Sequence, residues 1–476
     1  MSSSSEFNRT RILVPSGVLG LGFDRKALAD GVLLKPDLIA IDGGSTDSGP
    51  AYLGTGKSKY AHAVTTGEWR ELLDARHAAG CPLVIGSAGT CGVDAQVNSM
   101  LEITRGWSDE HGVPLRIATL CTEITPRTVL TSIEQDRLSP LGSIAVNQSL
   151  VDAIADCTHI VALAGAEPIA AALAAGADVV IAGRTTDTAL FAALPIARGA
   201  DPGAAWHAAK TVECGALCST APASGVVIVD IDDTGFTVNA LGDGAVCTPY
   251  TISAHMLYEN TDPVVLYEPG GHLDVSYARY VESGSGVRVT GSQWITDDRY
   301  TVKLEGARRL GQQCSSLVLV REPRYVEHID RWCHTLEARL REDVARHLGA
   351  IDYTLELRRI GRDATLGAAE FDTRTPVEIG VLLLVTATSD ELALSIAQLA
   401  NPLLLHHGLP EDTSMPSFAF PYTPAETPRG SVFAFCLDHV MSIDHWSDAC
   451  RLDVIEHTPA LMPAQLPAHM PAMKPA

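Results

Sequence analysis

Apolar positions in the first part of the chain fall into short runs that are separated by helix-like segments. Apolar runs on both faces are typical of strands covered by helices on both sides, and they lie at residues 11–14, 37–41, 82–86, 115–120, 159–164 and 178–181. The segments between them have helical spacing and include residues 65–79, 93–106, 126–136 and 167–175. Strand–helix–strand repetition predicts parallel pairing in a doubly wound α/β sheet.

The pattern changes at about residue 225, where short β-like runs are separated by Gly, Pro and Asp. These runs lie at residues 226–230, 235–240, 264–267, 286–290 and 300–304. We expect a β-rich extension that packs on the first sheet.

The pattern changes again near residue 315. Strand-like runs alternate with two amphipathic helices in the order β-α-β-β-α-β, at residues 316–320, 326–347, 353–358, 376–386, 389–406 and 432–440. That order predicts a ferredoxin-like split unit. The expected organisation is therefore a disordered N-terminus (1–10), an α/β domain (11–314) whose β-rich extension starts at about 225, a ferredoxin-like α+β domain (315–457) and a mobile Pro/Ala-rich tail (458–476).

The net charge of the chain argues against two classes of binding partner. The 476 residues carry a formal net charge of -22, which opposes binding to nucleic acid or to an anionic membrane surface. No apolar run approaches the length of a membrane span, and the Ser-rich start lacks the apolar core of a signal peptide. The 11 Cys form no CxxC pair, so we expect reduced thiols in a cytoplasmic protein.

Candidate chemistry lies in the loops that follow five predicted strands, because ligands bind outside the carboxyl ends of strands in open parallel sheets. These loops combine small residues with acids, hydroxyls and one Arg: Asp42, Gly43, Gly44, Ser45 and Asp47; Ser87, Gly89 and Thr90; Glu123; Gly165 and Glu167; Arg184, Thr185, Thr186 and Asp187. Carboxylates can act as general acids or bases or hold a metal, and Arg184 can clamp a carboxylate or phosphate.

Each loop taken alone is more typical of an ordinary turn or helix N-cap than of a site. The coincidence of five such loops at one sheet edge favours a site. Several nucleotide and metal motifs are excluded. The run Gly17–Gly22 is not GxGxxG, and Gly54–Ser58 lacks the first Gly of a Walker loop. No HExxH or HxH pair is present, so a zinc site is not expected, whereas carboxylate-held Mg²⁺ is possible.

The segment from His207 to Cys218 offers a second candidate set. His207 and Lys210 are three residues apart on one helical face, and Glu213 follows at the next turn beside Cys214. They form either an acid–base set or a solvated helix face followed by a buried Cys.

The blocks 137–148, 163–169, 179–188 and 207–214, together with 257–259 before Asp262, resemble the acyclic terpene utilisation AtuA family. The resemblance covers roughly residues 10–305, and the C-terminal split unit is similar to the ferredoxin-like domain of that family. It implies that Asn147 and Gln148 contribute to the site, that some relatives have a small separate partner protein, and that acyl-CoA metabolism is a possible context. Residues 268–274 depart from the family's acidic Pro-Asp-Val stretch, so we transfer no terpene substrate.

Three functions remain open. The first is a lyase or hydratase for a small carboxylate or acyl-CoA, in which Arg184 anchors a carboxylate, Glu167 or Asp187 moves the proton and the 86–92 loop donates amides to an enolate oxygen. Glu123, Glu213, His207 and Lys210 are further acid–base candidates. The second is a non-catalytic binding or scaffold subunit. The third is a hydrolase with Mg²⁺ between Asp42, Asp47 and Asp187. We expect a homo-oligomer and no firmly assigned cofactor.

Overall fold

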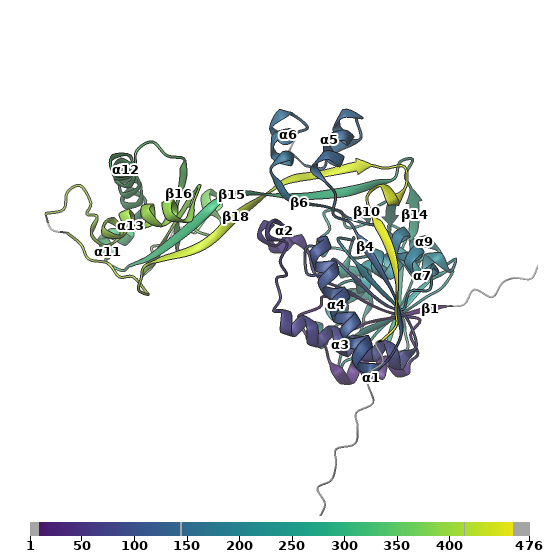
Figure 1. Ribbon diagram of the computed structural model, residues 1–476. Coiled ribbons are helices and arrows are strands. Elements are labelled where there is room, and N and C mark those ends of the chain that lie inside the picture. Colours follow the sequence, from purple (N-terminus) through teal and green to yellow (C-terminus); the bar gives the residue numbers. More distant parts are fainter. Residues whose placement is uncertain (1–8, 143–144, 373, 414, 460–476) are drawn as a thin grey trace, which may run out of the picture. The chain divides into compact units, whose positions relative to one another are not determined.

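The computed structural model describes residues 9–142, 145–372, 374–413 and 415–459. The chain forms two units, one of residues 1–307 with 435–476 and one of residues 308–434 (Figure 1). Their boundaries differ from the predicted 314/315 division. Of the predicted terminal segments, residues 1–8 and 460–476 lie outside the described residues, and Thr10 already belongs to the first strand.

Unit 1 contains a ten-stranded mixed sheet in the order β12-β13-β9-β8-β1-β2-β3-β7-β4-β19. Its strands are β1 (Thr10–Val14), β2 (Leu38–Asp42), β3 (Leu83–Gly86), β4 (Leu115–Cys121), β7 (Val179–Ala182), β8 (Val227–Ile231), β9 (Gly235–Ala240), β12 (Arg279–Ser283), β13 (Gly286–Thr290) and β19 (Arg451–His457). The five central strands β1, β2, β3, β7 and β4 pair in parallel, as predicted from the strand–helix repetition.

Alternate residues of the central strands face opposite layers of helices. Ile12 and Val84 belong to one apolar core, with α7, α8 and α9, whereas Leu13 and Ile85 belong to the other, with α1, α3 and α4. Figure 1 shows α3 and α4 on one side of the sheet and α7 and α9 on the other. Burial on both faces explains why these runs lack polar alternation, and each fully buried Leu or Ile contributes about 1.5–3 kcal/mol.

The α-helices of unit 1 alternate with its strands along much of the chain. They are α1 (Arg25–Leu33), α2 (Pro50–Thr55), α3 (His62–Ala79), α4 (Asp94–His111), α5 (Pro126–Glu134), α6 (Gln148–Ala155), α7 (Ala166–Ala174), α8 (Ala189–Ala197), α9 (Pro202–Val212) and α10 (Pro249–His255). Of the described helices, none is long and apolar enough to cross a bilayer.

One predicted member of the parallel sheet lies elsewhere. The strand β6 (Cys157–Ala162) pairs with β15 (Thr301–Val320), so only four of the five candidate loops follow strands of the large sheet. Its apolar pattern is the same as that of a central strand. Its partner lies about 140 residues further along the chain, which local pattern does not encode.

The predicted runs of the β-rich extension divide among three sheets, because residues 301–304 belong to β15. Strands β8, β9, β13 and β12 continue the large sheet by antiparallel pairing from β1. Strands β10 (Val265–Glu268), β11 (Gly271–Asp274) and β14 (Gln293–Thr296) form a separate antiparallel sheet.

Two long strands, β15 and β18 (Glu426–Ser442), belong to both units. Residues 300–304 and 316–320 were predicted as separate strands, but β15 is continuous through Gly306 and Gly311. Within unit 1, the short strand β5 (Leu138–Pro140) pairs with the end of β18. The chain then returns to the large sheet, where β19 pairs with β4.

Unit 2 packs three α-helices against a sheet with the order β16-β17-β15-β18. Its remaining elements are α11 (Pro323–Glu327), α12 (Ile329–Leu348), β16 (Tyr353–Ile360), β17 (Ile379–Ala387) and α13 (Asp390–His406). Trp332 and Leu336 of α12 pack with Val381 and Leu383 of β17 in its apolar core.

Candidate functional site

A cavity of about 650 Å³ lies at the carboxyl ends of β1 and β2, a volume in the range of small-molecule sites. Segments that are distant in the sequence line it: Ser16, Gly17, Val18, Leu21, Gly22, Asp42, Gly44, Ser45, Asp47, Ser48, Lys59, Tyr60, Asp187, Glu213, Cys214, Ala216, Leu217, Pro222, Ala223, Gly225, Tyr258 and Glu259. Of the candidates from sequence, the structure brings Asp42, Gly44, Ser45, Asp47, Asp187 and Glu213 together here.

The loop after β2 brings Asp42 to the cavity. Its Oδ2 accepts a hydrogen bond from the Gly44 amide at 2.9 Å, whereas Oδ1 is buried without a hydrogen-bond partner among the described residues. Gly44 has φ 127°, and a Cβ there would lie 2.9 Å from the Thr90 Cα, so glycine is required for this close approach.

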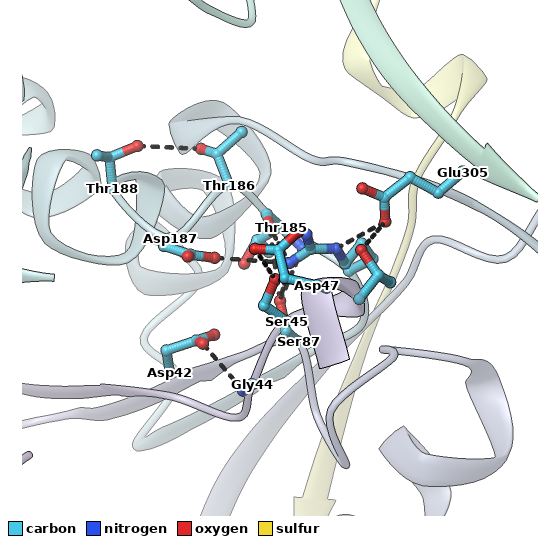
Figure 2. Close-up of polar contacts among 12 residues, drawn as sticks. Asp42, Gly44, Ser45, Asp47, Ser87, Thr185, Thr186, Asp187, Thr188 and Glu305 are labelled. Atoms are coloured by element: carbon cyan, nitrogen blue, oxygen red, sulfur yellow. Dashed lines mark hydrogen bonds and ion pairs between the residues drawn. The ribbon is translucent and has the colours of Figure 1, made fainter. Parts of the chain in front are cut away.

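The loop after β7 brings Asp187 to the same cavity, held by Arg184. The buried guanidinium donates to Glu305 Oε2 at 3.1 Å and to Ser87 Oγ at 3.0 Å, and its Nη1 lies 3.5 Å from Asp187 Oδ1. Figure 2 shows Asp187 and Asp42 pointing into the same space. Arg184 does not line the cavity, so it supports Asp187 instead of presenting a free clamp.

The pKa values of Asp42 and Asp187 are both raised from their ordinary values. Burial raises the pKa of Asp42 well above its ordinary value, and the neighbouring charge of Asp187 raises it further. Burial also raises the pKa of Asp187, although the Arg184 guanidinium opposes this rise. Burial and the nearby charge of Asp187 therefore favour the protonated form of Asp42.

The end of α9 forms another part of the wall. Lys210 Nζ donates to Glu213 Oε1 at 2.6 Å and to the Tyr258 carbonyl at 2.9 Å, and both side chains are buried. Burial raises the pKa of Glu213 to about 8, against the opposing effect of Lys210. The reading of this segment as a solvated helix face is therefore wrong for Lys210 and Glu213.

His207 points away from this pair although it lies on the same helix. It is fully buried, with Nδ1 2.6 Å from Ser292 Oγ and Nε2 3.3 Å from the Tyr280 hydroxyl. Burial lowers the pKa of His207 to about 3. Residues three apart on an α-helix point in directions that differ by about 60°. Here that difference is enough to place His207 in the core while Lys210 engages Glu213 beside the cavity.

Two predicted acids have protein partners outside the cavity lining. Glu123 Oε1 lies 2.6 Å from His159 Nδ1 and Oε2 accepts from the Asp94 amide. Burial opposes ionisation of Glu123, but the hydrogen bonds of His159 and of the Asp94 amide, together with the charge of His159, outweigh burial and lower the pKa of Glu123. Glu167 is exposed, and its Oε2 accepts from the Tyr300 hydroxyl at 2.6 Å.

Asn147 and Gln148 are exposed and lie at the start of α6, where Asn147 Oδ1 caps the Leu150 amide and Gln148 contacts Asp152. Gly165 precedes α7 as its N-cap residue. None of these three residues is among the described residues of the cavity wall.

Four amides of the 86–92 loop are engaged within the protein and are therefore not free to bind an enolate oxygen. The amides of Ser87, Ala88, Thr90 and Gly92 donate to the carbonyls of Gly183, Ala182, Gly43 and Ala88, respectively. Ser87 and Thr90 have positive φ angles of 44° and 80°, and Gly89 has 64°, so this loop is a strained support behind the site.

Gly43 packs directly against the 86–92 loop. A Cβ at this position would lie 2.6 Å from the Ser87 carbonyl oxygen, so a side chain does not fit. Thr185 is buried, and Thr186 accepts a hydrogen bond from Thr188.

Sequence reasoning missed most of the opposite wall. Lys59 and Tyr60 follow the rejected Walker-like run, and Gly17 and Gly22 belong to the rejected glycine run, yet all four line the cavity. Glu259 has a φ of 51°, an uncommon conformation for a non-glycine residue that often marks functional sites. The glycine runs were a usable local signal, and Glu259 lies in one of the blocks that resemble the family, whereas Glu305 had no such signal.

Comparison with known proteins gives one match. The model of the acyclic terpene utilisation family protein AtuA matches residues 51–409, which include Arg184, Asp187, Lys210 and Glu213. Neither the curated proteins nor the solved structures gave a significant match.

Proposed function

Since this chain belongs to the acyclic terpene utilisation family AtuA, we propose that it is a lyase of the hydratase type, which acts on a small carboxylate or an acyl-CoA thioester. The observation that carries the proposal is the pair Asp42 and Asp187, two buried carboxylates at one cavity, each with a raised pKa because of burial. Elimination of water needs one group that accepts a proton and one that donates a proton, and such a pair supplies both.

The roles follow from the neighbours of each acid. Asp187 lies beside the Arg184 guanidinium, which favours its ionised form, so Asp187 is the base that removes the proton next to the substrate carbonyl. Asp42 has an unpartnered buried Oδ1 and donates its proton to the departing hydroxyl, which leaves as water. The reverse sequence adds water to the double bond.

Substrate class follows from the remaining wall. Lys59 is the positively charged side chain among the described residues that line the cavity, and it supplies an anchor for a carboxylate or phosphate group. Val18, Leu21, Leu217 and Pro222 give the cavity an apolar side. A substrate with an anionic group at one end and a hydrocarbon chain at the other matches the basic and apolar parts of this wall. The name of the family refers to acyclic terpenes, which are hydrocarbons of this kind.

A screen of small hydroxycarboxylates and CoA esters tests the proposal. A bound ligand raises Tm by mass action, and a true substrate incorporates deuterium next to its carbonyl in deuterated water, which NMR detects. Ligands that raise Tm without proton exchange or water addition contradict a hydratase and support a non-catalytic binding subunit.

The Mg²⁺-dependent hydrolase remains a second candidate because Asp42, Asp47 and Asp187 all line the cavity. Carboxylate oxygens are preferred Mg²⁺ ligands. Hydrolysis of a phosphate or thioester that requires added Mg²⁺ and stops with EDTA favours this function over the lyase.

We further infer a fold assignment for each unit. Helices on both sides of the parallel strands of unit 1 support a doubly wound sheet. In unit 2, the order β-α-β-β-α-β and the strand order β16-β17-β15-β18 support a ferredoxin-like domain. Sheet edges of such units can pair with another chain, and a homo-oligomer or a small partner protein remains a proposal that analytical ultracentrifugation tests.

A further inference from the structure

Three different ligand types meet where the ends of two helices approach each other. Glu213 and Cys214 follow α9, and His255 ends α10. One carboxylate oxygen, the Cys214 sulfur and one imidazole nitrogen all lie within 4.8 Å of one another. Adjacent ligands of a small tetrahedral ion are separated by less than this distance, since each lies about 2.0–2.3 Å from zinc.

His255 provides independent evidence for a ligand. Its side chain is 5% exposed, and Nε2 is buried without a hydrogen-bond partner among the described residues. A buried polar atom that makes no hydrogen bond costs free energy unless another partner binds it. The ring stacks on Tyr258 at 5.5 Å with an interplanar angle of 12°, which fixes its orientation.

Acidic side chains, which offer oxygen ligands, outnumber basic ones on the cavity wall beside the cluster. Five carboxylates line the cavity, at Asp42, Asp47, Asp187, Glu213 and Glu259, and Lys59 is the positively charged residue of the described wall. Lys210 lies behind the wall and engages Oε1 of Glu213, which leaves the second oxygen of this carboxylate for an ion. Outer hydrogen bonds of this kind commonly orient metal-binding carboxylates.

We propose that Glu213, Cys214 and His255 hold a zinc ion at the cavity wall. Carboxylate, thiolate and imidazole together suit Zn²⁺ better than Mg²⁺ or Ca²⁺, which prefer oxygen ligands. Glu213 and Cys214 line the cavity, so a fourth position on the ion faces bound substrate, as in zinc sites that act on substrates. Binding of the substrate carboxylate or thioester oxygen by the ion rests on the proposed function, whereas the presence of the ion does not.

The test measures metal directly in the full chain purified without chelators. We expect about one zinc per chain by mass spectrometry of the metal, and replacement by Co²⁺ should produce the near-ultraviolet absorption of a cobalt–thiolate bond. Cys214→Ser should abolish this band, and His255→Gln should lower zinc content about tenfold or more. Cys218→Ala is the matched control, because Cys218 is a buried thiol four residues further on and outside the cluster.

Circular dichroism of each variant establishes that metal loss is measured on folded protein. A folded wild-type chain with neither zinc nor a cobalt–thiolate band overturns the proposal, and Lys210 is then the cation of this cluster. A band that survives Cys214→Ser also overturns it. Because neither readout requires turnover, a metal-free chain that still exchanges substrate protons refutes the ion alone, and a zinc-bound chain without exchange refutes the lyase alone.

Discussion

Unit 1 contains acids of two kinds, and their surroundings differ more than their sequence contexts. Asp42 and Asp187 line the cavity, and burial raises the pKa of each. Glu123 and Glu167 also follow strands, but His159 and Tyr300 engage them outside the cavity wall. We call the first pair the cavity acids and the second pair the partnered acids.

The difference lies in what the fold does with the hydrogen-bonding capacity of each group. A partnered acid is satisfied by the protein and stabilises its neighbourhood. A cavity acid is held in a costly environment with a free oxygen, as at Asp42 Oδ1, and such groups are typical of sites where stability has been exchanged for function. Four predictions test this contrast.

The largest effect is expected on turnover. Asp187→Asn and Asp42→Asn should each lower kcat by about 10²–10⁴-fold on the substrate found by screening, because each removes a proton-transfer group. Glu167→Gln is the matched control and should leave kcat near the wild-type value. Equal losses in all three variants would remove the distinction between cavity and partnered acids.

The next effect concerns Arg184, which supports a cavity acid through an enclosed ion pair with Glu305. Arg184→Met should destabilise the fold by about 3–5 kcal/mol, because it removes the buried cation of Glu305 and leaves only the partly exposed Lys303, 3.4 Å from Glu305 Oε1. Urea unfolding measures this change. The double variant Arg184→Met/Glu305→Gln should recover much of the loss, and a double variant no more stable than the single one would contradict the ion-pair explanation.

The third prediction concerns the pH dependence of stability, which should depend on the buried His207 of α9. Burial lowers its folded pKa to about 3 from the usual 6.5, so the unfolded chain takes up a proton first as pH falls. The neutral ring therefore stabilises the fold above pH 6.5, and this stability is lost towards pH 3. Relative to His207→Gln, the wild type should lose about 2 kcal/mol between pH 8 and pH 5 in urea unfolding. Parallel pH curves for the two proteins would contradict this account.

The smallest effect contrasts stability at two acids. Burial raises the folded pKa of Asp42, so its ionised form is unfavourable at pH 8, and Asp42→Asn should raise Tm there. Burial opposes ionisation of Glu123, but its hydrogen bonds with His159 and the Asp94 amide and the charge of His159 together lower its folded pKa. Glu123→Gln should therefore lower Tm at pH 8, with a loss of stability below about 1 kcal/mol. Both differences should shrink in acid as the carboxylates protonate, and shifts of the same sign at pH 8 would contradict the contrast.

Local pattern was sufficient for much of the fold. Within the predicted strands, residues 12–14, 38–41 and 83–85 are apolar at every position because helices cover both faces, and the structure confirms their parallel pairing. The same signal was misleading at β6, whose apolar run pairs with β15 instead. Pattern reports burial but not the identity of the hydrogen-bonding partner.

For the site, the rule that ligands bind at the carboxyl ends of parallel strands located Asp42 and Asp187 from the residues alone. Which acids would remain open to a ligand depended on contacts between segments far apart in the chain. Tyr300 reaches Glu167 across 133 residues, and Glu305 reaches Arg184 across 121. Desolvation and pairing with such distant groups control each pKa, so the chemical character of these residues appears only once the chain has folded.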